Sequence, residues 1–389
     1  MYSHRLSWST APNNIHDLVR RKRRAGIRLL DLTQSNPTRV LPDYPHAAIS
    51  RAYGAVSDFT YQPDPAGTWE AREAVSGYYG QRDFAVPPDR LVLTASTSEA
   101  YALLFKLLCD AGDEVLVPVP SYPLFEYLAA LEGVRVVPYR LCYDGSWHID
   151  FTHLRDQISP RAKAIVIVTP NNPTGSVLKT FEARELLRIG EERHLPIISD
   201  EVFMDYPLRK LPHAAPTLAA QSSVLTFALN GLSKAAGMPQ MKLGWVVLGG
   251  PADEIKCARE NLELLLDTYL SVGTPAQNAL PDLLKIGAGI RAQIVRQVKQ
   301  NLATLGKALD GSPAHCLETE AGWSAIVRLP SVRTEDNWTA RLVEEGNTIV
   351  QPGYFFDMEQ EAYIVVSLIT PADEFEEGAS KMRSLVENE

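Results

Sequence analysis

Between about residues 90 and 250, short apolar runs rich in β-branched residues alternate with longer stretches of helical periodicity. This alternation is the pattern of parallel strands joined by crossover helices. Several runs are apolar without polar alternation, as expected for strands that are covered on both faces. We therefore predict an α/β core, with strands at residues 91–94, 114–119, 134–141, 164–169, 196–200, 224–228 and 244–248.

The sequence changes character beyond about residue 275. A long, more polar helical region precedes strand-like runs at residues 323–329, 348–351 and 363–368. A last helix is expected after Thr370, which would cap it, with Pro371 at the first helical position. These features predict a large α/β domain at residues 46–279 and a small α+β domain formed by residues 1–45 together with residues 280–389.

The overall composition argues against several classes of protein. Apolar residues make up 45% and charged residues 22% of the 389 residues, which is ordinary for a globular protein. A net charge of −9 argues against a nucleic-acid partner, because phosphate binding depends on clustered positive charge. The four cysteines match neither a zinc pattern nor a disulfide framework. No stretch reaches the roughly 18 apolar residues of a membrane helix, and the segment that starts with Met1-Tyr2 does not have the pattern of a signal peptide. We therefore expect a cytoplasmic protein with no metal and no membrane partner.

A hydroxyl-rich turn, Ser96-Thr97-Ser98, lies between the first predicted strand and a helix at about residues 99–108. That helix has apolar residues at i, i+3, i+4 and i+7, so it should be largely buried. A phosphate at the turn would meet free backbone N–H groups, the positive end of the helix dipole and up to three hydroxyls. The alternative is a helix cap with nothing bound, because Ser and Thr are favoured there anyway.

Four other residues end or follow predicted strands: Tyr122, Asn172, Asp200 and Lys234. Each alone has an ordinary explanation as a core tyrosine, a turn residue, a cap or a surface lysine. Because the carboxyl ends of parallel strands meet at one edge of a sheet, where open α/β sheets bind ligands, we expect these side chains to lie together. An amine, a carboxylate and an amide are the groups that pyridoxal phosphate needs for its carbonyl, its ring nitrogen and its ring oxygen.

With these motifs in order, the chain resembles the class I/II, fold-type I pyridoxal phosphate aminotransferases of the aspartate aminotransferase superfamily. The resemblance covers nearly the whole chain and implies a large, mainly parallel α/β domain, a smaller α+β domain and a homodimer with active sites between subunits. The most specific motifs are Asn172-Pro173-Thr174-Gly175, Ser199-Asp200-Glu201, and Ser233-Lys234 followed by Gly237, Lys242 and Gly244-Trp245.

The resemblance implies a role for each matching residue. Lys234 would hold the cofactor as a Schiff base and then act as the base that moves a proton. A free lysine has a pKa of about 10.4, so its surroundings must keep this amine neutral. Asp200 would pair with the ring nitrogen, Asn172 would donate to the ring oxygen, and Tyr122 would stack on the ring. The phosphate would be bound by Ser96, Thr97, Ser98 and Lys242, with Tyr61 contributed by the partner subunit.

Four positions depart from the family pattern. Phe203 replaces a tyrosine that usually contacts the ring oxygen, and Gly231 replaces a phosphate-binding serine. Lys242 replaces an arginine, which keeps the charge but loses the bidentate fork. The largest departure is Val365, at the position of the arginine that clamps the substrate's α-carboxylate. A valine cannot bind a carboxylate, so another cation must do so or the substrate is not a plain α-amino acid.

The segment Ser35-Asn36 and the nearby Arg39 are candidates for substrate contacts, with Arg39 as the replacement cation. Arg328 is a weaker candidate because it ends a predicted strand. The leading functional hypothesis is ping-pong transfer of an amino group from an amino donor to an oxo acid. A β/γ-lyase, decarboxylase or cyclase reaction on the same scaffold is the alternative, since fold does not fix chemistry, and a non-catalytic cofactor-binding protein is the third.

Overall fold

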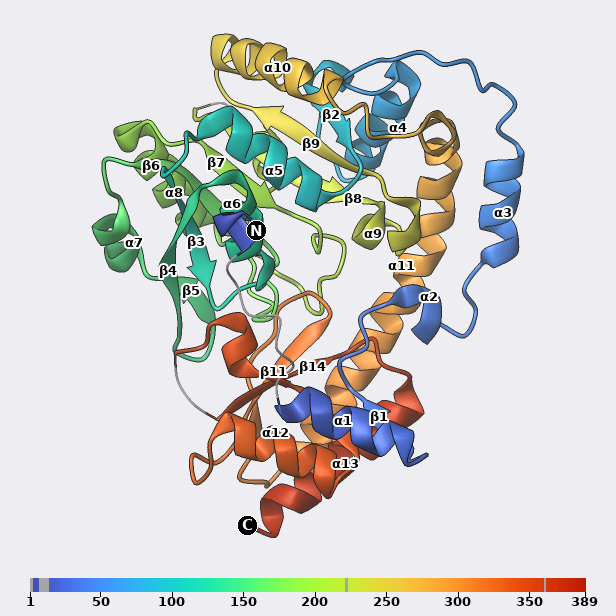
Figure 1. The fold of residues 1–389 in the computed structure, drawn as a ribbon, viewed down its shortest axis with the longest axis vertical. Coiled ribbons are helices and arrows are strands. Elements are labelled where there is room, and N and C mark those ends of the chain that lie inside the picture. The colour runs from blue at the N-terminus through green and yellow to red at the C-terminus, as the bar shows by residue number, and fades with distance from the viewer. Residues whose placement is uncertain (1–2, 7–13, 221–222, 360–361) are drawn as a thin grey trace.

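The computed structural model describes residues 3–6, 14–220, 223–359 and 362–389, so Met1 and Tyr2 lie outside the described residues. The helices and strands form two regions, one around a large sheet and one around smaller sheets near the C-terminus (Figure 1). In the described part of the chain, no helix combines the length and the apolar character needed to cross a membrane.

The large sheet has eight strands in the order β2-β9-β8-β7-β6-β3-β4-β5. Strands β3, β4, β6, β7 and β8 pair in parallel, whereas β9 is antiparallel to both its neighbours and β5 is antiparallel to β4. Strands β7, β8 and β9 are buried along their whole length, which is why they are apolar without alternation. The bounds are β2 Leu91–Thr94, β3 Glu114–Val119, β4 Arg135–Tyr143, β5 Trp147–Ile149, β6 Ala162–Val168, β7 Ile197–Asp200, β8 Thr226–Gly231 and β9 Gly244–Gly249.

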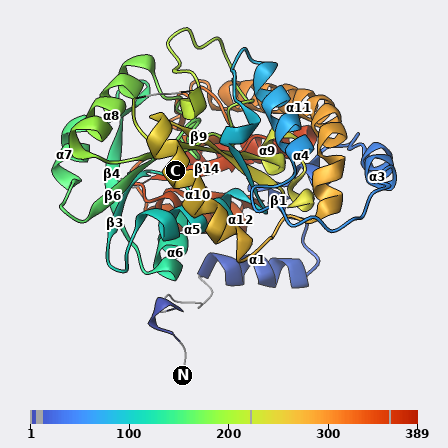
Figure 2. The same cartoon turned by 90° about the horizontal axis from the view of Figure 1, so that it is seen from above.

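Helices cover both faces of this sheet (Figure 2). One face packs against α5, α6 and α10 in a single apolar cluster. The other face packs against α7 and α8 near β3 and β6, and against α3, α4 and α11 near β2, β8 and β9. The bounds are α3 His46–Gly54, α4 Trp69–Gly80, α5 Thr97–Leu108, α6 Leu124–Glu132, α7 Phe151–Gln157, α8 Thr180–Arg193, α9 Leu232–Ala235, α10 Ala252–Asp267 and α11 Thr274–Leu309.

The second region contains a four-stranded antiparallel sheet in the order β10-β11-β14-β13. The N-terminal segment belongs to this second region, because β1 pairs with β12 in a two-stranded sheet and α1 packs on α12 (Figure 1). The long helix α11 packs on α4 above and on α13 below. The bounds are α1 Asn14–Arg24, β1 Leu30–Asp31, α2 Pro37–Val40, β10 His315–Cys316, β11 Ser324–Arg328, α12 Glu335–Glu344, β12 Thr348–Ile349, β13 Gln351–Pro352, β14 Tyr363–Ser367 and α13 Ala372–Glu387.

The α/β fold class is confirmed, with corrections in detail. The predicted strand at residues 348–351 is two short strands in different sheets, since β12 pairs with β1 and β13 pairs with β14. The last helix starts one residue later than predicted, with Pro371 as its N-cap. This N-cap has no side-chain hydrogen bond to the helix, and the Thr370 hydroxyl donates instead to the backbone oxygen of Asp31 at 3.4 Å.

Candidate active site

The side chain of Lys234 projects from α9, directly after β8. Its Nζ lies 5.8 Å from the ring centre of Phe203 and 5.4 Å from that of Trp323. The backbone oxygen of Lys234 accepts a hydrogen bond from the Tyr206 hydroxyl, which anchors the short helix. Burial lowers the pKa of Lys234, and the negative charge of Asp200 acts in the opposite direction. The surroundings therefore shift this amine toward its neutral, nucleophilic form.

Asp200 is the last residue of β7, two strands from β9 and directly beside β8. Its Oδ1 accepts from the backbone N–H of Val202 at 3.2 Å, and its Oδ2 accepts from the Tyr101 hydroxyl at 3.1 Å. Burial raises the pKa of Asp200 to about 6, although these two hydrogen bonds and the charge of Lys234 lower it. A buried carboxylate in this setting has a strong need for a cationic partner.

Asn172 lies in the tight turn that follows β6. The Asn171 side-chain oxygen accepts from both the backbone N–H and the hydroxyl of Thr174, and these bonds hold the turn in shape. The Asn172 Oδ1 accepts from the Ser324 hydroxyl at 3.2 Å. This contact occupies the oxygen of the amide and leaves its NH₂ group to donate elsewhere.

Gly175 closes this turn against the second region of the molecule. Its φ is +68°, and a Cβ at this position would lie 2.6 Å from the backbone oxygen of Ala321. The Gly175 oxygen also accepts from the Ala321 N–H at 3.0 Å. Only glycine permits this backbone contact, which brings Trp323 and Ser324 toward Lys234 and Asn172.

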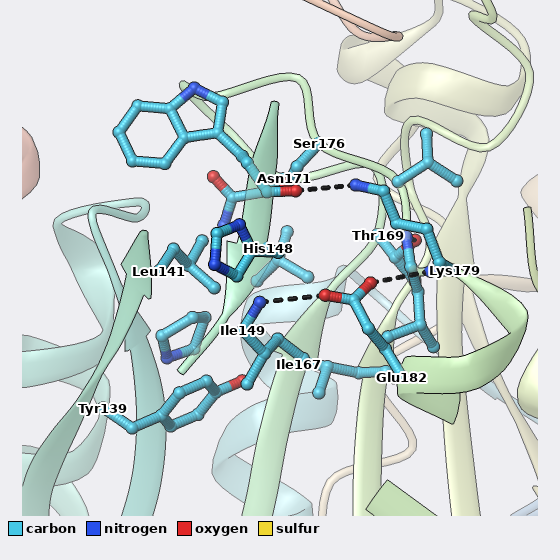
Figure 3. Close-up of a pocket in the computed structure, with 15 residues that line it drawn as sticks. Tyr139, Leu141, His148, Ile149, Ile167, Thr169, Asn171, Ser176, Lys179 and Glu182 are labelled. Atoms are coloured by element: carbon cyan, nitrogen blue, oxygen red, sulfur yellow. Dashed lines mark hydrogen bonds between the residues drawn. The ribbon is translucent and has the colours of Figure 1, made fainter. Parts of the chain in front are cut away.

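A separate pocket lies behind the turn (Figure 3). Its polar side chains bond to protein groups: Glu182 accepts from the backbone of Ile149 and of Lys179, and Lys179 Nζ donates to the Trp147 oxygen and to Glu320. Lys234, Asp200 and Asn172 do not line it. This pocket adjoins the turn through Asn171 and Ser176 and is distinct from the candidate active site.

The hydroxyl-rich turn predicted as a phosphate site forms the start of α5. Ser96 is the N-cap, and its hydroxyl accepts from the Glu99 N–H at 3.1 Å. Helix capping and phosphate binding are therefore compatible at this turn. The capping hydroxyl still has a proton to donate, and the first-turn N–H groups have no hydrogen-bond partner within the helix. A Cβ on Gly244 would lie 3.1 Å from the Ser96 carbonyl carbon, so the turn adjoins the start of β9. Thr97 and Ser98 are partly buried there.

The structure explains why Gly231 replaces a serine. Gly231 pairs with Gly244 across β8 and β9. A Cβ on Gly231 would lie 2.9 Å from the Gly244 Cα and 3.0 Å from the Leu243 oxygen. Any larger residue would push these two strands apart. Nearby, Lys242 has an exposed side chain on a left-handed backbone with φ of 49°.

Tyr122 lies between β3 and α6 and is partly exposed. Its pKa is raised first by its burial and then by the negative charge of Asp200. The second effect means that Tyr122 lies within electrostatic range of Asp200.

Val365, at the position of the missing arginine, is 1% exposed in β14. It packs in an apolar cluster with Trp147, Leu317, Ile326 and Phe356. The space around this position is therefore filled by apolar side chains. A charged carboxylate would gain no ion pair from this cluster.

The N-terminal segment reaches this face of β14. The Ser367 hydroxyl donates to the Gln34 oxygen, and the Ser367 N–H donates to the Leu32 oxygen at 2.7 Å. Ser35, exposed, follows Gln34 directly. The Asn36 side chain caps α2 by accepting from the Thr38 N–H at 3.1 Å, so its oxygen is already used. Arg39 is exposed on α2.

Arg328 and Tyr61 lie apart from these groups. Arg328 pairs with Tyr363 and is exposed at the end of β11, four residues from Ser324. Tyr61 is 72% exposed, and the pocket that it lines contains none of the other candidate residues. A single chain therefore does not bring Tyr61 to Lys234.

Sequence reasoning missed three residues of the site: Tyr101, Trp323 and Ser324. Tyr101 is the hydroxyl-bearing residue in an otherwise apolar stripe of α5, and that irregularity was the available signal. Ser324 begins β11 far along the chain and Trp323 directly precedes it, and only the fold brings them to the site.

The donor set fits pyridoxal phosphate. The buried Asp200 carboxylate can pair with a pyridinium, the Lys234 amine can bond to an aldehyde carbon, and the Asn172 NH₂ can reach a ring oxygen. The start of α5 supplies N–H groups and hydroxyls for a phosphate. These side chains define a site for a phosphorylated aldehyde cofactor with a basic ring nitrogen.

Comparisons with known proteins identify the family. The family model described as "Aminotransferase class I and II" matches residues 28–381, so the chain belongs to this pyridoxal phosphate-dependent family. It is 32% identical to the glutamate-pyruvate aminotransferase AlaA of Escherichia coli over 270 residues, a match that spans 68% of this chain and 66% of the relative. It is 30% identical over 271 residues to the alanine aminotransferase of Mycobacterium bovis, spanning 68% of this chain and 62% of that relative.

A solved structure shows the same fold. The alanine aminotransferase from Pyrococcus furiosus superposes with a TM-score of 0.88 at 24% sequence identity, and the superposition covers 100% of both chains. The expected fold-type I architecture and the pyridoxal phosphate cofactor are therefore confirmed.

Proposed function

We propose that this protein is an aminotransferase that moves an amino group between an amino donor and an oxo acid by a ping-pong mechanism. The observation that carries the proposal is the buried Lys234 amine, with its lowered pKa, beside the Asp200 carboxylate at one edge of the large sheet. This is the pair that the reaction needs for a base and for an electron-accepting ring.

The proposed roles are those that the family resemblance implies, and the contacts of Asp200 and Asn172 support them. When bound, the cofactor supplies a ring that accepts the electron pair left behind as a proton leaves the substrate carbon. Asp200 keeps the ring nitrogen protonated, and the Asn172 amide donates to the ring oxygen. Lys234 Nζ takes the proton and returns it to the neighbouring carbon. Tyr122 stacks on the ring, and the phosphate is held by Ser96, Thr97, Ser98 and Lys242.

The absence of a hydroxyl on Phe203 has a chemical consequence in this proposal. Asn172 would be the residue that donates to the ring oxygen, and Ser324 orients its amide for that contact. A ring oxygen with fewer donors holds its negative charge less well, so the lysine-bound cofactor should keep its proton to higher pH.

For the substrate, we propose an amino acid whose carboxylate is bound away from Val365. The named relatives support small amino acids and oxo acids as substrates. The apolar cluster around Val365 argues against a clamp on β14. Arg39, Ser35 and Asn36 are the proposed replacement, because their segment is hydrogen-bonded to the end of β14.

We also propose a cytoplasmic homodimer in which Tyr61 completes the phosphate site of the partner. The exposure of Tyr61 and of Phe59, 72% and 67%, supports a covered position in an assembly. Light scattering should give twice the mass of one chain; the mass of a single chain would contradict the dimer.

We propose domain limits at residues 46–279, and at 1–45 with 280–389. The pairing of β1 with β12 supports the placement of the N-terminal segment with the C-terminal region.

The reaction can be tested with the cofactor-loaded protein. Each of a panel of amino donors is added, and the absorbance of the lysine-bound cofactor is followed together with the amount of pyridoxamine phosphate. Stable pyridoxamine phosphate, reconverted by an added oxo acid, is the expected result. Release of ammonia and an oxo acid without an acceptor would instead support a lyase, and no response to any donor would support a non-catalytic protein.

A further inference from the structure

The hydroxyl of Tyr101 contacts the carboxylate expected to bind the cofactor ring. We propose that Tyr101 is a positioning residue, whose phenol holds Asp200 in the orientation and charged form that binds the ring nitrogen. This inference rests on the proposed function, because it concerns the same cofactor site.

The geometry around Asp200 supports this role. The Tyr101 hydroxyl reaches Oδ2 from α5 at 3.1 Å, and the Val202 N–H reaches Oδ1 from the chain after β7 at 3.2 Å. Donors on both oxygens resist rotation of the carboxylate. Each oxygen keeps a further lone pair, so a ring N–H can still be accepted.

The phenol of Tyr101 is itself held rigidly. Its ring meets Phe125 edge-to-face at 5.2 Å and lies 5.9 Å from the ring of Phe105. Tyr101 is 3% exposed. A phenylalanine would serve the packing equally well, so the hydroxyl is there for a polar reason, and its hydrogen bond among the described residues is to Asp200.

The charges around Asp200 show why a donor matters. Burial raises the pKa of Asp200 to about 6, and Tyr101, Val202 and Lys234 each work against that effect. The other nearby ionisable groups, Tyr122 and Glu201, offer no positive charge. Without the phenol, the pKa of Asp200 should rise further. The carboxyl would then be partly protonated near neutral pH, where it could not stabilise a pyridinium.

The test compares Tyr101→Phe with Tyr139→Phe. Tyr139 is equally buried, and its hydroxyl donates to the Val166 oxygen at 2.8 Å, away from Asp200. Pyridoxal phosphate is titrated into each apoprotein across a pH series. We expect Tyr101→Phe to weaken cofactor binding about tenfold, the effect of losing one hydrogen bond to a charged group. As the pH is lowered, this variant should lose the cofactor with a midpoint at a higher pH than the wild type. Tyr139→Phe should keep the wild-type affinity and pH midpoint.

A second measurement follows the ring itself. With ¹⁵N-labelled cofactor, the ring nitrogen signal should move toward the unprotonated position in Tyr101→Phe only. If that variant folds poorly, 3-fluorotyrosine at position 101 keeps the ring and strengthens the donor, so the pH midpoint should move downward. If the Tyr101→Phe protein keeps the wild-type cofactor affinity, pH midpoint and ring nitrogen signal, the proposed role of Tyr101 is wrong, whereas the proposed function still stands. Failure of the wild-type protein to bind the cofactor would overturn the proposed function instead.

Discussion

The two sides of the candidate active site differ in kind. The side built on the large sheet is polar, with Asp200 and Asn172 each hydrogen-bonded by a neighbouring side chain. The side built on β14 is apolar, because Val365 is packed among Trp147 and three other apolar side chains. The first side keeps the groups that a cofactor requires, and the second lacks the cation that usually binds a substrate carboxylate.

This difference teaches that cofactor binding and substrate binding are separable in this fold. The cofactor groups come from strands of one sheet, whose carboxyl ends meet by topology. The substrate side comes from another sheet, and it meets the first through the contact between Gly175 and Ala321. A residue on β14 can therefore change without disturbing Asp200 or Lys234.

The largest effect on the polar side of the site is expected from Lys234→Ala. Removing the amine takes away both the covalent attachment and the base, so the transfer rate should fall by roughly 10²–10⁴-fold or more. The absorbance of the lysine-bound cofactor should also disappear, as a spectrum would show. Lys242→Ala is the matched control, since it should weaken cofactor binding but keep the absorbance band. An unchanged band in Lys234→Ala would refute the assignment of this lysine.

On the apolar side, Val365→Arg should lower the free energy of unfolding by about 3 kcal/mol or more, because a charge would be buried without a partner. Urea denaturation measures this loss. Val365→Met adds a long side chain without charge, so it separates the effect of charge from that of bulk. A stable Val365→Arg protein with faster transfer from α-amino acids would mean that the arginine position is open, contrary to the packing described above.

A smaller effect is expected for Gly231→Ser, which restores the residue usual in the family. The added Cβ would lie 2.9 Å from the Gly244 Cα, so the strands must shift, at a cost of about 1–3 kcal/mol in unfolding free energy. Gly289→Ser in α11 is the control, because nothing lies within 4 Å of a Cβ there. Equal stability of the two variants, together with tighter cofactor binding by Gly231→Ser, would show that the serine fits.

Strands β2, β7, β8 and β9 of the large sheet were predictable because burial demands continuous apolar runs. The predicted bounds of β2 and β3 agree with the structure. The direction of β9 was not predictable from its composition, since parallel and antiparallel strands in a buried sheet look alike. The short β5 and the split between β12 and β13 escaped notice because two or three residues carry no periodicity.

The cofactor site was predictable for a related reason. Lys234 and Asn172 follow strands and Asp200 ends one, and strand order brings their positions to one edge. The substrate side was only half predictable: the sequence reveals that Val365 cannot bind a carboxylate, but its apolar neighbours come from four other segments.

By itself, the sequence determined the chemical groups at the sheet edge, because short local motifs place them after strands. The tertiary structure decided how those groups are held. Tyr101 and Asp200 are 99 residues apart in the chain, and Gly231 is restricted by a glycine on the neighbouring strand. Such contacts depend on how helices and sheets pack, and packing joins residues whose separation in the sequence carries no signal of their proximity.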